Sequence, residues 1–373
     1  MQNKKQKLGF LFYGNPNDAK HWSGTIARMY NTLQGSDDFD VEVINVPQGY
    51  FEKWIYKATR ILSFKKNELS FLMNYVNSFV CNKMIKNSSC DVIFAPAGSK
   101  IIYSGKSELK NKKIIYMSDA TYHIMLGYYY NHSLHDQKIG NTWEKNAHVI
   151  AKDIILASNW AYKDAVSYYK TEEEKVHVLK FGANMNDVGC KVVKASQKQY
   201  NLLLVGVDWK RKGIDVAIET VKLLNEAGNN KYTLTIVGVD KPETNYPDYI
   251  RFIGRLNKND EREYLQLEQT YKEADIFILP TKAECAGIVF AEAAMFGLPS
   301  FTYSTGGVND YVEDSVTGRC LNISEGAIEF KNAIEEAILS GNIENYSINA
   351  RRKYEKELNW GVWLRNFESI YNG

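Results

Sequence analysis

The chain has 373 residues, of which 45% are hydrophobic and 24% are charged. This length allows two or more domains, and this composition excludes a disordered tail, a collagen-like rod and a disulfide-stabilised mini-protein. The formal net charge of only +2 argues against nucleic-acid binding as the main function.

Charge is distributed unevenly along the chain. Residues 1–198 contain 27 Lys and Arg against 18 Asp and Glu, whereas residues 199–373 contain 19 against 26. A net charge of +9 followed by one of −7 indicates two domains that meet different partners.

The sequence carries no sign of export, membrane insertion or metal binding. It has neither a signal-peptide core near Met1 nor an apolar run of about 18 residues that could span a bilayer. The five cysteines include no CxxC pair, which is typical of a reducing compartment. We therefore expect a cytoplasmic protein. The histidines form neither HxxxH nor HExxH, so we expect no metal site, and we expect no other cofactor.

Short β-branched runs alternate with stretches of helical periodicity along the chain, which predicts two consecutive α/β units. Continuously apolar runs such as Leu202–Gly206 are typical of parallel strands covered on both faces. The strands predicted in the first half are Leu8–Tyr13, Val41–Val46, Asp91–Ala95, Lys113–Met117, Ile154–Ser158 and Val176–Lys180. Those predicted in the second half are Tyr200–Gly206, Tyr232–Gly238, Tyr249–Gly254, Asp275–Pro280, Ser300–Tyr303 and Arg319–Ile323.

The segment Asp187–Lys198 lacks a strong period, which places the boundary between the units near residues 186–199. We expect one domain over residues 1–190 and a second over residues 191–350. Residues 351–373 are expected to form a helix near the domain junction. Since open parallel sheets bind ligands at the carboxyl ends of their strands, a ligand should lie between the two units.

The most informative segment runs from Leu279 to Thr305. A strand should end at Pro280, and a helix should begin near Gly287 and end at Phe296. Glu292, on the second turn of this helix, is the only charged residue between Cys285 and Asn309. A buried carboxylate needs hydrogen-bond donors, and these come either from a partner inside the protein or from the hydroxyl groups of a ligand.

Glu284 favours a ligand, because it precedes the same helix and can face one molecule together with Glu292. The backbone N–H groups of Ala286, Gly287 and Ile288, at the positive end of the helix dipole, favour an anion between the two carboxylates. A cationic loop, Lys210–Lys212, also lies between a predicted strand and a predicted helix. On its own, that loop is more simply a solvated cluster.

Together these motifs resemble glycosyltransferase family 4, a family of retaining enzymes with the GT-B fold. Glu284 to Glu292 matches the E-x7-E signature of that family, and GLP and TGG follow it. Further resemblances lie in GVDWKRKG (Gly206–Gly213), RFIGRL (Arg251–Leu256), SNW (Ser158–Trp160) and FGAN (Phe181–Asn184). The resemblance covers most of the chain.

The resemblance implies two Rossmann-like domains that face each other across a cleft. Residues 1–190 would bind the acceptor, and residues 191–350 would bind the nucleotide sugar. It also implies a retaining, metal-independent hexosyltransferase that moves a sugar from a nucleoside-diphosphate sugar to a glycan or lipid-linked acceptor in bacterial surface polysaccharide synthesis. Glu292 would hold the ribose, Glu284 the donor sugar and Lys212 the diphosphate. The remaining donor-binding residues would be Arg211, Arg255, Leu256, Cys285, Ala286, Gly287 and Ile288.

One residue departs from the family pattern. Relatives carry an Arg directly after the first glycine of the cationic loop, whereas Val207 follows Gly206 here. Either Arg211 supplies the second cation, or one fewer positive charge holds the phosphates.

In the first half, Ser23 and Gly24 open a helix in a place similar to the family's glycine loop. Gly24 allows close backbone approach to a diphosphate, while Ser23 is either a ligand contact or a helix cap. Asp119 ends a buried strand where many relatives carry a His, with His123 one turn further on. Asp119 would orient an acceptor hydroxyl as a catalytic residue, or it would cap a helix.

Residues 50–87 mix aromatic and basic side chains at helical spacing. Such a helix either rests on an anionic membrane surface or is a solvated face over the core, and we expect peripheral membrane contact.

Two other kinds of function stay open. One is a nucleotide-sugar epimerase or phosphorylase of the same fold, and the other is a catalytically silent glycan-binding scaffold.

Overall fold

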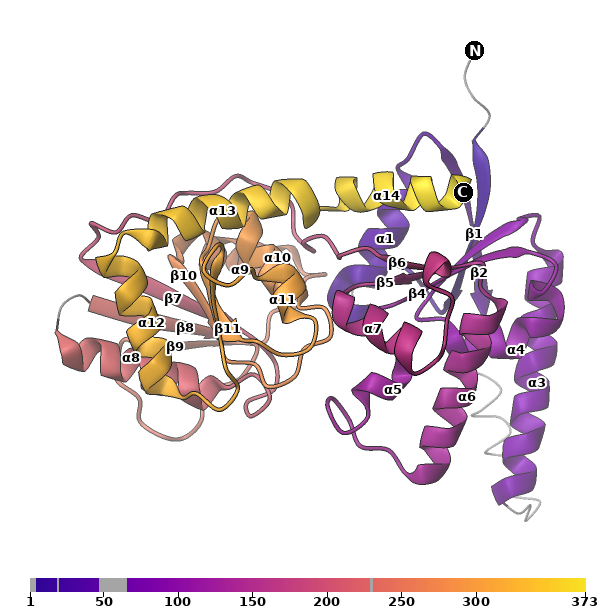
Figure 1. Cartoon of the computed structure of the whole chain (residues 1–373), viewed down its shortest axis with the longest axis horizontal. Helices are drawn as coiled ribbons and strands as arrows, with labels where there is room; N and C mark the ends of the chain where they lie inside the picture. Colours follow the sequence, from indigo (N-terminus) through magenta and orange to yellow (C-terminus); the bar gives the residue numbers. More distant parts are fainter. Residues whose placement is uncertain (1–4, 19, 47–65, 229–230) are drawn as a thin grey trace. The chain divides into compact units, whose positions relative to one another are not determined.

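The structure is a computed structural model that describes residues 5–18, 20–46, 66–228 and 231–373. Of residues 66–76 it describes the backbone alone. The chain divides into two compact units (Figure 1). Unit 1 comprises Met1–Leu179 with Asn366–Gly373, and unit 2 comprises Lys180–Arg365.

Unit 1 is built on a parallel sheet with the strand order β2-β1-β3-β4-β5-β6. The register places Leu8 beside Val41 on one side and Val92 on the other. The order reverses between β1 and β3, so the loops that follow these two strands diverge there. The strands are β1 (Gln6–Tyr13), β2 (Phe39–Val46), β3 (Val92–Pro96), β4 (Lys113–Ser118), β5 (Asp153–Leu156) and β6 (Val176–Val178).

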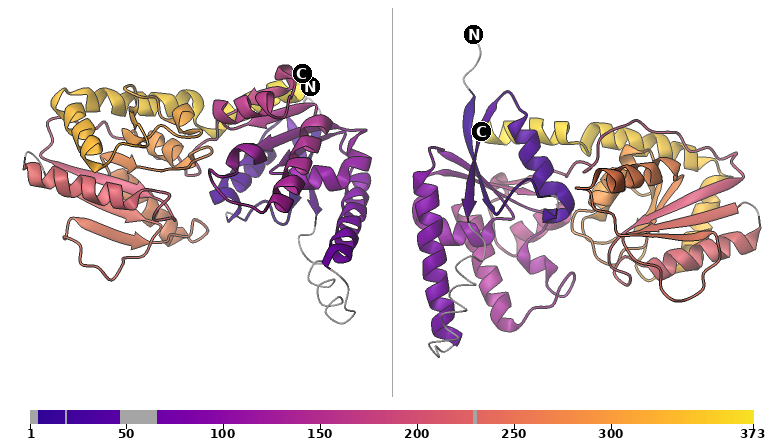
Figure 2. Two further views of the ribbon diagram at one scale, coloured as in Figure 1. Left: turned by 60° about the horizontal axis from the view of Figure 1, so that its bottom comes forward. Right: turned by 180° about the vertical axis from the view of Figure 1, so that it is seen from behind.

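The helices of unit 1 lie on both sides of its sheet (Figures 1 and 2). They are α1 (Thr25–Gln34), α3 (Lys66–Asn87), α4 (Ser99–Leu109), α5 (Tyr122–Met125), α6 (Leu134–Ile150) and α7 (Asn159–Ser167), with short 3-10 turns η1 (His21–Gly24) and η2 (Glu173–Lys175). Helix α4 packs between α3 and α6. The last helix, α14 (Trp360–Asn372), returns to this unit, where Phe367 contacts the rings of Phe39 and Phe94.

Unit 2 has a second parallel sheet with the strand order β12-β11-β10-β7-β8-β9. Its order reverses between β7 and β10, which pair directly, Ile276 lying beside Leu202. The strands are β7 (Gln199–Val205), β8 (Lys231–Val237), β9 (Ile250–Gly254), β10 (Ile276–Leu279), β11 (Ser300–Tyr303) and β12 (Gly318–Leu321).

The helices of unit 2 also cover both faces of its sheet (Figure 2). Helix α8 packs on α12, and α10 packs on α13. The helices are α8 (Ile214–Ala227), α9 (Glu261–Glu273), α10 (Ile288–Met295), α11 (Val308–Tyr311), α12 (Ala327–Leu339) and α13 (Asn342–Glu357). Each strand predicted from the sequence is confirmed, with ends that differ by at most two residues.

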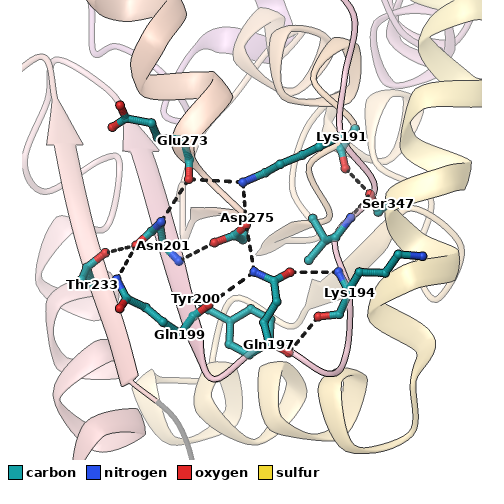
Figure 3. A network of polar contacts seen from close by, with 12 residues as sticks. Lys191, Lys194, Gln197, Gln199, Tyr200, Asn201, Thr233, Glu273, Asp275 and Ser347 are labelled. Carbon is teal, nitrogen blue, oxygen red and sulfur yellow. Dashed lines mark hydrogen bonds and ion pairs between the residues drawn. The ribbon is translucent and has the colours of Figure 1, made fainter.

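The division between the units lies at Leu179–Lys180, ahead of the predicted boundary region 186–199. The segment that follows Lys180 is fastened into unit 2 by polar contacts, some of which Figure 3 shows. Lys191 Nζ lies 2.7 Å from Oδ1 of the buried Asp275, and Val193 N–H donates to Ser347 Oγ at 3.0 Å. Because these contacts are made by single side chains, the lack of periodicity in this segment did not reveal them.

The predicted C-terminal helix is also broken in two. Helix α13 ends at Glu357, and α14 begins at Trp360. Asn359 causes the break, because its amide donates to the carbonyl of Tyr354 and its Oδ1 accepts from the N–H of Val362. One side chain thus serves the end of one helix and the start of the next. Helix α14 starts in unit 2 and ends in unit 1.

Candidate functional site

The loops that follow β7 and β10 meet at the point where the strand order of unit 2 reverses. Open parallel sheets bind ligands at such a point, outside the carboxyl ends of the strands. Lys282 N–H donates to the carbonyl of Arg211 at 2.7 Å, which holds the two loops together. Gly213 has a φ of +67°, and a Cβ there would lie 2.1 Å from the carbonyl oxygen of Pro280. Only a glycine therefore allows this close approach.

Lys212 and Glu284 form an ion pair between these loops. Lys212 is only 7% exposed, which is rare for a lysine unless a carboxylate pairs with it. Arg211 reaches the same carboxylate, with Nη1 3.9 Å from Glu284 Oε2, and donates to the carbonyl of Ala283 at 3.0 Å. Two of the three cations of the predicted loop, Arg211 and Lys212, thus converge on Glu284, whereas the side chain of Val207 is exposed.

Glu284 is held in front of helix α10. The N–H of Gly307 donates to its backbone carbonyl at 3.0 Å, so the loop after β11 fixes the loop after β10. Gly287 caps α10 in the left-handed conformation, with a φ of +70°. The predicted start of this helix near Gly287 is therefore confirmed. The first N–H groups of α10 supply partial positive charge next to a carboxylate and two cations.

Glu292 lies on α10 and is 1% exposed. Lys258 Nζ donates to its Oε1, and the Tyr271 hydroxyl donates to its Oε2 at 3.0 Å. Burial raises the pKa of Tyr271 well above its usual value, and the negative charge of Glu292 raises it further. The partner that this buried carboxylate requires is thus found inside the protein, as a lysine and a tyrosine. Each carboxylate oxygen has a second lone pair, so these contacts leave acceptor capacity for a hydroxyl group.

The other predicted donor-binding residues of unit 2 lie around these two carboxylates and after β9. Cys285 and Ala286 are buried between Glu284 and the start of α10, where Ile288 is the first residue of the helix. Arg255 and Leu256 directly follow β9, Arg255 exposed and Leu256 half-buried.

Ser23 and Gly24 belong to unit 1, after β1 and therefore at the point where that sheet reverses its order. Gly24 is the N-cap of α1 with a φ of +92°, and no side chain caps the helix. The interpretation of Ser23 as the cap is therefore wrong: the backbone already turns at Trp22 and Ser23, both with positive φ, so the helix begins one residue later.

Asp119 follows β4, and its Oδ1 accepts from the N–H of Ala120 at 2.9 Å. The N-cap of α5 is Thr121, without a side-chain cap, so the interpretation of Asp119 as a helix cap is wrong. Asp119 lies two positions too early, because the chain bends at Asp119 and Ala120 and the residue that precedes the helix is Thr121.

The sequence did not predict two residues of this site, Lys258 and Tyr271. Lys258 lies in an exposed loop before α9, and Tyr271 follows the helical spacing of a core residue. Their only signal was the isolation of Glu292 in an apolar helix, which requires donors but does not say where they come from.

In the described part of the chain, no group of three or more His, Cys, Asp or Glu side chains could hold a metal ion. None of the described helices is both long and apolar enough to cross a membrane. Of the segment 50–87 that was expected at a membrane surface, residues 50–65 lie outside the described residues, and 66–87 form α3.

Comparisons with known proteins point in one direction. Residues 191–354 match the family described as Glycosyl transferases group 1. Lipopolysaccharide glucosyltransferase WaaG of Escherichia coli strain K12 is 29% identical over 177 residues, which are 44% of this chain and 47% of WaaG. The matched region thus spans about half the length of that relative. An uncharacterized 41.2 kDa protein in the cps region of Klebsiella pneumoniae is 25% identical over 327 residues, 81% of this chain and 84% of that protein.

Among solved structures, sucrose-phosphate synthase from Thermosynechococcus elongatus superposes with a TM-score of 0.69 at 15% identity. The superposition covers 99% of this chain and 98% of that one. The predicted α/β fold is therefore confirmed: two six-stranded parallel sheets with flanking helices form the architecture of the GT-B glycosyltransferases.

Proposed function

We propose that this chain, whose residues 191–354 form a group 1 glycosyltransferase domain, transfers a hexose from a nucleoside-diphosphate sugar to a hydroxyl group. The acceptor is a glycan or lipid-linked glycan in bacterial surface polysaccharide synthesis, and the anomeric configuration is retained. The names of the relatives support this setting, since one is a lipopolysaccharide glucosyltransferase and another lies in a cps region.

One observation carries the proposal: Lys212, Arg211 and Glu284 converge in front of α10, at the point where the sheet of unit 2 reverses. A nucleoside-diphosphate sugar has hydroxyl groups at both ends and two phosphates between them. The cations and the first N–H groups of α10 match the phosphates. Glu284 matches the hydroxyl groups of the sugar, and Glu292, eight residues later, those of the ribose.

Negative charge grows on the diphosphate as the glycosidic bond breaks, so cations already in place lower the barrier. Lys212 is suited to this task, because its pairing with Glu284 positions it before the reaction starts. Removing one preorganised donor of this kind costs about 3–4 kcal/mol of transition-state stabilisation. In the chemistry that we propose, the acceptor attacks from the face that the diphosphate leaves, and a diphosphate oxygen takes the proton. This needs neither a protein nucleophile nor a metal ion.

Binding of the ribose makes a demand on Glu292. Both carboxylate oxygens already accept from Lys258 and Tyr271. The ribose hydroxyl groups use the remaining lone pairs or displace Lys258, whose side chain is 21% exposed. The base lies against the backbone near Arg255 and Leu256.

Unit 1 receives the acceptor in this proposal. In this unit Asp119 orients the acceptor hydroxyl, and Ser23 and Gly24 are the residues that we propose as further donor contacts. We place the enzyme in the cytoplasm at the inner face of the membrane, where residues 50–87 meet a lipid-linked acceptor.

The test offers UDP-glucose, GDP-mannose and dTDP-glucose as donors and total bacterial lipid-linked oligosaccharide as the acceptor. Sugar transfer is measured as release of the nucleoside diphosphate. Lys212→Met should lower kcat by about 100-fold or more, while Lys210→Met, which removes an exposed cation of the same loop, should change it less than threefold. Full activity of Lys212→Met contradicts the proposed site. Release of nucleoside diphosphate without any need for an acceptor points instead to hydrolysis of the donor. Conversion of the donor to an epimeric nucleotide sugar, without net release of nucleoside diphosphate, points to an epimerase.

A further inference from the structure

A histidine with a fixed orientation lies just after β4 in unit 1. His123, on α5, has its Nδ1 2.8 Å from Oδ1 of Asp164 on α7. Asp164 is 7% exposed, and its second oxygen accepts from the Thr121 hydroxyl. The buried carboxylate therefore holds the Nδ1 proton and directs the opposite edge of the imidazole, with Nε2, away from α7.

Two neighbouring tyrosines fix this ring further. His123 stacks flat on Tyr168, with ring centroids 3.4 Å apart and an interplanar angle of 6°. The N–H of His123 donates to the Tyr169 hydroxyl, which in turn donates to Asn141 Oδ1 at 2.6 Å. An imidazole held by a carboxylate, a stacked ring and its own backbone has lost its rotamer freedom before any ligand arrives.

The same group is accessible. The His123 side chain is 39% exposed and Tyr168 is 47% exposed. Within the described residues, Asp164 is the hydrogen-bond partner of the imidazole, through Nδ1, and Nε2 has no partner. A polar group that is rigid and exposed at the same time is arranged for a ligand rather than for the core, where Nε2 would require a partner.

The loop after α5 and the first turn of α7 carry further aromatic residues. The loop after α5 carries Tyr128 and Tyr129, and Tyr129 is 40% exposed. Tyr128 packs against Trp160, on the first turn of α7, with ring centroids 4.9 Å apart. The elements that hold His123 and Asp164 thus also present several aromatic rings.

We propose that His123, oriented by Asp164 and stacked on the exposed ring of Tyr168, binds a hydroxyl group of a neutral carbohydrate. This inference rests on the proposed function and extends it, because it assigns part of the acceptor site to residues other than Asp119. His123 acts here as a positioning group, with Nε2 hydrogen-bonded to one sugar hydroxyl.

The chemistry of the surface selects a sugar. A pyranose ring has one apolar C–H face, which packs on a tyrosine, and a rim of hydroxyl groups, which need directed polar partners. Tyrosine supplies such contact area with little loss of conformational entropy. An anionic ligand fits less well, because the charge of Asp164 lies directly behind the imidazole.

Unit 1 contains a matched control. His177, on β6, also pairs with an aspartate: its Nε2 lies 3.0 Å from Oδ1 of Asp153. Its side chain is 30% exposed, close to the value for His123. Asp153 begins β5, so this pair lies at the amino end of the sheet, away from the strand ends where ligands bind.

The experiment measures binding of the full chain to an array of immobilised neutral oligosaccharides of hexose and N-acetylhexosamine units, with UDP binding measured in parallel. His123→Ala and Tyr168→Ala should each weaken glycan binding at least tenfold. Tyr168→Phe keeps the ring and His123→Gln places an amide near the position of Nε2, so both should stay within about threefold of the wild type. His177→Ala should bind as the wild type does, and UDP affinity should be the same in all five variants.

Two results would overturn the inference. One is glycan binding by His123→Ala or Tyr168→Ala at wild-type strength. The other is a wild-type protein that binds UDP but no neutral glycan of the array. The second result contradicts the carbohydrate site at His123 but not the proposed nucleotide site. A protein that binds glycans but no nucleoside diphosphate contradicts the proposed function but not the carbohydrate site.

Discussion

At the scale of single residues, the Glu292 carboxylate depends on Lys258 and Tyr271, which each donate to one of its oxygens. Lys258→Met removes the only cation described in contact with this buried charge. We expect a loss of about 2 kcal/mol in the free energy of unfolding, since a buried charge that loses a donor keeps its desolvation cost. Urea denaturation of the variant and the wild type measures the difference.

A control and a double variant make this prediction specific. Lys272→Met removes a lysine that is 40% exposed and pairs with Glu268 one turn away, so it should cost under 1 kcal/mol. Adding Glu292→Gln to Lys258→Met should recover part of the lost stability, because an amide carries no charge to neutralise. If Lys258→Met were as stable as Lys272→Met, the ion pair would contribute nothing to the fold.

How far the sequence could define this site depends on where each partner lies in the chain. Glu284, Glu292 and Lys212 belong to short motifs whose neighbours reveal their setting. Lys258 reaches Glu292 from 34 residues away and from an exposed loop, so only the tertiary structure brings the two together. The interpretation of Ser23 and Asp119 as helix caps was wrong for a local reason. A shift of one or two residues in the start of a helix changes which residue caps it.

At the scale of elements, Gly213 sets how closely the start of α8 approaches the end of β10. Gly213→Ala would place a Cβ 2.1 Å from the carbonyl oxygen of Pro280, at a φ of +67°. Gly228→Ala, at the other end of α8, has a similar φ of +73° but no atom within 4 Å of the new Cβ. The two substitutions thus share the backbone strain, and only the first adds a clash with backbone.

We expect Gly228→Ala to cost about 1 kcal/mol and Gly213→Ala several times as much, together with weaker nucleoside diphosphate binding. Thermal unfolding with and without UDP measures both effects. Equal losses of stability in the two variants would show that the loops after β7 and β10 have room to separate.

A second prediction at this scale concerns the segment before β7 and helix α13. Two hydrogen bonds from the Arg351 guanidinium lower the pKa of the Asp187 carboxyl below its usual value of 3.8, although partial burial opposes this shift. Because the pKa is lower in the folded protein, the contribution to stability is present above pH 3.8 and is lost as the pH falls through the folded-state pKa.

Asp187→Asn should therefore lower stability by up to about 1 kcal/mol at pH 7, a value kept small by solvent screening, and by less at pH 3. Asp248→Asn, at an exposed position of the same unit, should have no effect at either pH. Urea midpoints of the three proteins at the two pH values check this. A difference between wild type and Asp187→Asn that stays constant with pH contradicts the assigned pairing.

The strands could be predicted within two residues because continuous apolar runs between turn-forming residues are a local signal. The ends of the long C-terminal helix could not, since Asn359 breaks it with its own side-chain hydrogen bonds rather than with a proline or glycine. The boundary between the units could not be predicted for a related reason, since Lys191 and Val193 bind to residues that lie 84 and 154 positions away.

At the scale of the whole molecule, the chain crosses from unit 1 to unit 2 at Lys180 and returns within α14. Phe367, on the returning half of this helix, is fully buried, and its ring lies 5.8 Å from that of Phe39 and 5.0 Å from that of Phe94. Residues near the C-terminus thus complete the core of the N-terminal unit.

Phe367→Ala should destabilise unit 1 by about 3–5 kcal/mol, because it leaves a cavity among aromatic rings. Hydrogen exchange should show faster exchange of the amides of β2 and β3, and unchanged exchange in β7, β8 and β10. The exposed Ile328, on α12 of unit 2, provides the control, since Ile328→Ala removes no buried contact. Faster exchange in both sheets of Phe367→Ala would show that the units unfold as one.

Isothermal titration with UDP, GDP and dTDP measures whether unit 2 binds a diphosphate between the loops after β7 and β10, as we propose. At least one of these should bind the wild type and the exposed-lysine variant Lys210→Met equally, and should bind Lys212→Met at least tenfold more weakly, about 1.4 kcal/mol. Equal affinity of Lys212→Met and the wild type for every nucleotide that binds would show that Lys212 does not hold the diphosphate.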